Sequence, residues 1–128
     1  MEREASKPNK LNWVVLSIFG PFLIVAGIAG FFIPAQYSLT SGATPYNLFH
    51  ILFGAIGLFI VSLRRELYAA LFNILFGSID LYQALASFVG LTPKQYFLWT
   101  PVDDYLHVLI GIVLIAIGFR GLLQKSRA

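Results

Sequence analysis

The chain has 128 residues, of which 58% are hydrophobic and only 12% are charged. Soluble domains carry about a quarter charged residues, so this composition excludes an ordinary soluble domain and indicates an integral membrane protein. The net charge of +3 does not indicate nucleic-acid binding, because the basic residues lie in short clusters beside apolar segments, and the absence of cysteine excludes disulfides and thiolate metal sites.

Four apolar segments are each long enough to cross about 30 Å of hydrocarbon as a helix that rises 1.5 Å per residue. In chain order, the predicted spans are residues 13–33, about 46–63, about 67–90 and about 104–123. The connections 34–45, 64–66 and 91–102 carry turn-forming or charged residues. The first segment is longer than the core of a typical signal peptide. We therefore expect residues 1–128 to form one integral membrane domain, an all-α four-helix transmembrane bundle.

The basic residues are distributed unequally between the two sides of these spans. Eight of the nine lie on the side of the termini: Arg3, Lys7, Lys10, Arg64, Arg65, Arg120, Lys125 and Arg127. Only Lys94 lies on the other side. By the positive-inside rule we expect a multi-pass protein of the inner (plasma) membrane with both termini in the cytoplasm. Aromatic residues at the span ends, Tyr46 and Trp99 among them, are expected as anchors at the membrane surface.

The two halves of the chain resemble each other. Phe19-Gly20 and Phe76-Gly77, His50 and His107, and Gly54 and Gly111 are each separated by 57 positions. Each outer loop also ends in Thr-Pro, at Thr44 and at Thr100, which predicts a capping threonine with proline in the first helical turn. We expect a tandem duplication, with repeat A at about 13–63 and repeat B at about 67–123. Because both hairpins start on the same side, the repeats should be parallel.

The two histidines are the only ones in the chain and occupy equivalent positions of the repeats. Each has a polar residue three positions before it and a glycine four positions after it: Asn47 and Gly54 for His50, Asp104 and Gly111 for His107. The polar residues are expected to orient the imidazoles from the preceding turn. The glycines are expected to leave clearance for a flat group or a neighbouring backbone.

Three interpretations of the histidine pair remain open. The imidazoles could be structural, hydrogen-bonded within the outer third of the bundle. They could be axial ligands of a haem, or bind a related pigment, in an electron-transfer protein. They could also form a metal or proton site together with Asp80. Against haem, the outer side offers only Lys94 to pair with the propionates.

Asp80 is the one acid inside a predicted span, and Leu23 is its counterpart in the first repeat. Counting from Glu66 puts Asp80 about 9 Å below the outer boundary, close to the depth of the histidines. An intramembrane carboxylate is a candidate for proton or small-solute transport, and His50 or His107 are its expected partners, with Gln83 and Tyr82 near by. Asn73 should lie near the inner side as a polar contact between helices.

The motifs Asn47-Leu-Phe-His50 and Asp104-Tyr-Leu-His107 resemble those of a family of small bacterial four-helix membrane proteins of unknown function. This resemblance covers about residues 13–121 and implies the fold and the membrane, but no substrate. No catalytic motif is recognisable. We expect a structural or accessory membrane protein that contacts the lipid bilayer, as a homo-oligomer or a subunit of a larger complex, without a nucleic-acid partner. The alternatives are haem or pigment binding and transport through Asp80.

Overall fold

The computed structural model describes residues 9–127, with side chains as far as Gln124. Its four long helices are α2 (Leu11–Phe32), α3 (Thr44–Ser62), α4 (Glu66–Val89) and α6 (Pro101–Arg127). Two short elements, η1 (Ala35–Tyr37) and α5 (Lys94–Phe97), lie in the long connections. All four long helices are long and apolar enough to cross a membrane, which confirms the four predicted spans and the all-α class. Arg3 and Lys7, two of the basic residues used to predict orientation, lie outside the described residues.

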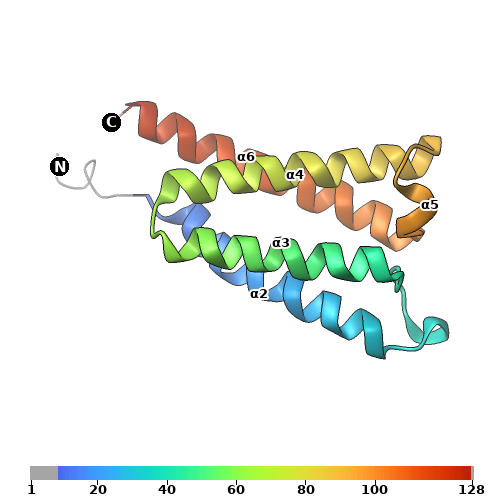
Figure 1. The fold of residues 1–128 in the computed structure, drawn as a ribbon. Helices are drawn as coiled ribbons and strands as arrows, with labels where there is room; N and C mark the ends of the chain where they lie inside the picture. The colour runs from blue at the N-terminus through green and yellow to red at the C-terminus, as the bar shows by residue number, and fades with distance from the viewer. Residues whose placement is uncertain (1–8, 128) are drawn as a thin grey trace.

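The helices are arranged as two antiparallel pairs, α2 with α3 and α4 with α6 (Figure 1). α4 also contacts both helices of the other pair, whereas no close backbone contact joins α3 to α6 among the described residues. α4 is accordingly the most buried span, with 56% of its apolar window inside the protein against 22–28% for the others. The other three helices expose many large apolar side chains, as expected for surfaces that face lipid.

Glycines allow the two helices of each pair to approach closely. A Cβ atom added at Gly54 would lie 2.7 Å from the carbonyl oxygen of Gly20, and one added at Gly111 would lie 2.8 Å from that of Gly77. Such contacts bring backbones together, which is how helices associate in lipid without a hydrophobic driving force.

At the end of the bundle where α2 starts and α6 ends, here the terminal end, Glu66 joins the helices. Its carboxylate accepts hydrogen bonds from the backbone N–H of Asn12 at 3.0 Å and of Trp13 at 2.9 Å. The Asn12 side chain also donates to Glu66 and to the carbonyl of Ile117, and it accepts a bond from Asn73 at 2.9 Å. The prediction that Asn73 makes a polar contact between helices is confirmed.

Candidate functional site

One face of the central helix α4 carries a row of polar side chains toward the opposite end, here the loop end, which holds η1 and α5. The row consists of Asp80, Gln83 and Ser87, each at most 7% exposed. Spacings of three and four residues place them on one side of the helix. These groups lie in the interior of the bundle, where an apolar row would otherwise be expected.

Asp80 has few hydrogen-bond partners for a buried acid. It is 3% exposed, and the one hydrogen bond found for its carboxylate comes from the Gln83 amide at 3.4 Å, a long contact. Gln83 was among the predicted neighbours, but among the described residues no hydrogen bond or ion pair joins Asp80 to either histidine. Tyr82 instead lies 46% exposed and donates its hydroxyl to the carbonyl of Thr92.

The two histidines are buried, with His50 8% and His107 5% exposed, and the Nδ1 atom of each has no hydrogen-bond partner within residues 9–124. The polar residues three positions before them do not supply one. The Asn47 amide donates to the carbonyl of Gly42, and its Oδ1 atom is unpartnered, as is Oδ1 of Asp104. These four buried polar atoms, in two pairs 57 positions apart in the chain, therefore have no hydrogen-bond partner among the described residues.

Aromatic rings connect the two histidines. The His50 ring lies 4.3 Å from that of Tyr46, which contacts Phe97, and Phe97 contacts Trp99 at 5.5 Å. The Trp99 ring in turn lies 6.2 Å from that of His107. Tyr46 and Trp99 were expected at the membrane surface but are buried, at 7% and 8% exposed. Both belong to one apolar cluster with Ala86, against which Phe97 packs.

These contacts do not fit a haem between His50 and His107. Phe97 packs against Tyr46 and Trp99 packs against His107, so aromatic rings already occupy space beside the histidines. The predicted clearance at Gly54 and Gly111 is already filled: Gly54 faces Ile24, and Gly111 faces Leu81, across the helix pairs. Nor do three or more His, Asp or Glu side chains gather as a metal site among residues 9–124.

Asp103 makes the densest set of hydrogen bonds at the loop end, although the sequence pattern had indicated Asp104 instead. Its buried carboxylate accepts bonds from the Tyr46 hydroxyl, the Ser41 N–H at 2.8 Å and the Thr100 N–H at 2.9 Å. It thereby ties both long connections to the start of α6. The spacing Thr100-x-x-Asp103, close to a capping box, is the signal that could have indicated it.

The two Thr-Pro pairs do not behave alike at the helix starts. Thr100 caps α6, since its hydroxyl accepts the N–H of Asp103 at 3.2 Å. Thr44 lies inside α3, which starts after Ala43 without a side-chain cap, so the predicted capping role of Thr44 is wrong. The proline sits in the first turn in both helices, as predicted.

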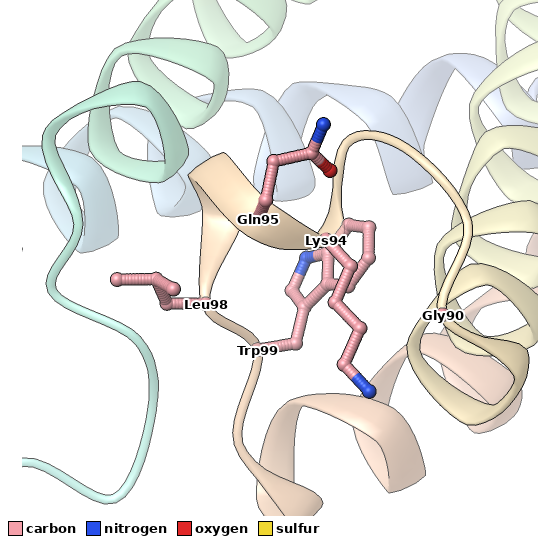
Figure 2. Close-up of a pocket in the computed structure, with 5 residues that line it drawn as sticks. All are labelled: Gly90, Lys94, Gln95, Leu98 and Trp99. Atoms are coloured by element: carbon pink, nitrogen blue, oxygen red, sulfur yellow. The ribbon is translucent and has the colours of Figure 1, made fainter.

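A pocket of about 500 Å³ opens beside α5, lined by Gly90, Lys94, Gln95, Leu98 and Trp99 (Figure 2). Trp99 forms its inner wall and donates its indole N–H to Gln83 at 3.0 Å. Lys94 donates to the carbonyl of Ser87 at 2.6 Å. The pocket therefore meets the polar row of α4 at Gln83 and the backbone of α4 at Ser87.

Comparison with known proteins gave no match, whether to a protein-family model, a curated protein or a solved structure. The likeness of the two histidine motifs to a membrane-protein family stays a resemblance.

Proposed function

We propose that this chain is a small accessory membrane protein of the plasma membrane, which acts as a structural unit in a homo-oligomer or a larger complex. The observation that carries the proposal is the use made of its polar side chains. Glu66 joins α2 to α4, and Asp103 joins the two long connections. These polar side chains thus hold the helices and connections of the bundle together.

The proposal includes two parallel hairpin repeats with both termini in the cytoplasm. The equivalent glycine contacts support the duplication: Gly54 against Gly20, and Gly111 against Gly77, 57 positions later in the chain. The orientation is supported by the eight basic residues on the terminal side against Lys94 on the other.

Cysteine labelling tests the orientation, because the chain has no native cysteine. Gln36→Cys in η1 and Ser62→Cys at the end of α3 both replace exposed residues. With a membrane-impermeant maleimide on intact cells, we expect only Gln36→Cys to react, and Ser62→Cys to react after permeabilisation. The opposite pattern would invert the proposed topology.

The accessory role is tested by assembly. Tagged protein is cross-linked in native membranes, and the mass of the protein extracted in mild detergent is measured by native mass spectrometry. We expect a defined complex, of this chain with itself or with a reproducible partner. A monomer in both measurements would contradict the proposal.

Haem or pigment binding is the weaker alternative, given the filled positions at Gly54 and Gly111. Protein expressed with haem available and purified in mild detergent is expected to show no Soret band. A Soret band that shifts on reduction and disappears in His50→Ala or His107→Ala would reverse this ranking.

A second candidate function, a proton site at Asp80, is favoured by one observation. Asp80 is a buried acid within a span, and among the described residues its carboxylate has only the long contact from Gln83. Such intramembrane carboxyls commonly mark proton or ion pathways. If Asp80 serves in this way, the four helices bind or pass protons in addition to their structural role.

A further inference from the structure

We propose that the Asp80 carboxyl exchanges its proton with the aqueous phase at the loop end only, through the pocket beside α5, with Trp99 as the group that controls access. This inference rests on the second candidate function, the proton site at Asp80. It adds the side of access, the route and the residue that limits it.

The route follows the polar row of α4. Asp80 contacts the Gln83 amide, and the Gln83 carbonyl oxygen accepts the indole N–H of Trp99, whose ring lines the pocket. One turn beyond Gln83, the backbone carbonyl of Ser87 accepts a hydrogen bond from Lys94 at the same pocket. The rise from residue 80 to residue 87 is about 10 Å, so this row spans the distance from the carboxyl to the pocket.

Trp99 closes this route in the observed conformation. It is 8% exposed, its N–H is held by Gln83, and its ring lies against His107. Figure 2 shows the indole behind the Lys94 side chain, between Leu98 and Gly90. Moving the indole would break one hydrogen bond and open the interior polar groups to the pocket.

In the other direction, aromatic packing closes the bundle. Phe76 lies one turn from Asp80 toward the terminal end and is 1% exposed. Its ring contacts those of four other phenylalanines, Phe19, Phe49, Phe53 and Phe72, with centroids 5.5–6.0 Å apart. This apolar layer offers no polar group to a proton, so access to Asp80 is expected from the loop end alone.

Carbodiimide labelling tests access directly, because these reagents add to protonated carboxyl groups. A water-soluble carbodiimide is applied to either side of sealed vesicles, whose orientation is read from the Gln36→Cys variant. The modification of the peptide that contains residue 80 is followed by mass spectrometry. Asp80→Asn provides the blank, since the same peptide then lacks the reactive group.

Two tryptophan variants report on the route, and the chain offers a matched control. Trp99→Phe keeps a ring but loses the bond to Gln83, so labelling from the loop side should rise about fivefold, the factor expected for one buried hydrogen bond. In Trp99→Ala, labelling of Asp80 from the loop side should rise further. Trp13→Phe removes the other indole, which donates to Val61 at the terminal end, and should leave the rate unchanged.

The possible outcomes distinguish a failure of the proposed access route from a failure of the proton site at Asp80. In one outcome, a lipid-soluble carbodiimide labels Asp80, but the water-soluble reagent applied from the loop side does not, even in Trp99→Ala. This result would overturn the route and leave the proton site standing. Equal rates from the two sides, or equal rates in Trp13→Phe and Trp99→Phe, would also overturn it. If neither reagent modifies Asp80 in the wild type or in Trp99→Ala, both the route and the proton site fail.

Discussion

α4 carries two acids, Glu66 at its first residue and Asp80 in its second half, and the surroundings of the two differ. Glu66, at the terminal end, accepts hydrogen bonds from two backbone N–H groups and one side-chain amide. Asp80, toward the loop end, receives one long contact from Gln83. The first carboxylate is held by the start of another helix, whereas the second is left almost without donors in the interior.

Asp103 extends the comparison to a third acid. Like Glu66, it accepts hydrogen bonds from segments far apart in the chain, through Ser41, Tyr46 and Thr100. The number of donors around a carboxylate therefore distinguishes the acids that hold this bundle together from the one that is available for other chemistry. Burial alone does not, since Asp80 and Asp103 are both almost inaccessible.

The largest effect is expected at Asp103. Asp103→Ala removes the acceptor for several buried donors and should lower the free energy of unfolding by about 3 kcal/mol. The change is measured by titrating the protein from mild detergent into sodium dodecyl sulfate, with circular dichroism as the signal. Asp104→Ala is the neighbouring control and should cost less than about 1 kcal/mol, because it loses no such network. Equal losses in the two variants would remove the distinction between the two acids.

A smaller loss is expected where helix backbones meet. In Gly111→Ala the new methyl would lie 2.8 Å from the Gly77 carbonyl oxygen, so α4 and α6 must separate. We expect a cost of about 2 kcal/mol in the same titration. Gly20→Ala is the control, because its nearest neighbour, the Gly54 carbonyl oxygen, would be 3.4 Å away. A Gly20→Ala variant as unstable as Gly111→Ala would contradict this account.

Glu66→Gln should cost about 1.5 kcal/mol, since hydrogen bonds from the start of α2 to a charged acceptor become bonds to a neutral one. The effect should show as loss of helix at the terminal end, measured by amide hydrogen exchange at Asn12 and Trp13. Arg65→Gln, one residue away, should leave this exchange unchanged. Protection that survives in Glu66→Gln would mean that the carboxylate charge contributes little to the start of α2.

The smallest effect is expected at the histidines. Because Nδ1 of His50 and of His107 has no hydrogen-bond partner, replacement by leucine removes no such bond there and should change stability by less than about 1 kcal/mol. The detergent titration measures this, with Tyr46→Phe as a comparison that does lose a bond to Asp103. A large loss in either leucine variant would indicate a partner for the imidazole that the described residues do not supply.

The spans could be predicted from the sequence because the thickness of the bilayer fixes the length of an apolar helix. Each predicted helix start lies within three residues of the observed one. The difference is largest for α6, which starts at Pro101 instead of residue 104. That small shift matters for the site. It places Asp103 inside the first turn of α6, where it meets Thr100, and this position could not be distinguished from that of Asp104 by spacing alone.

The loop-end site could be predicted only in part. Asp80 and Gln83 were identified because a polar residue within a span is conspicuous. Trp99 and Tyr46 were expected at the membrane surface, since an aromatic residue at a span end usually lies there. Their burial depends on how the connection 91–100 folds back over the bundle. The spacing of apolar residues along the helices does not predict the path of that connection.

The position of Glu66 also has a consequence for the order in which the chain assembles. The first turn of α2 is completed by an acceptor at the first residue of α4, 54 positions later. While the first hairpin stands alone in the membrane, the N–H groups of Asn12 and Trp13 must be satisfied by water or lipid headgroups. α2 thus acquires its final start only once α4 has been inserted, so formation of the second hairpin completes the first.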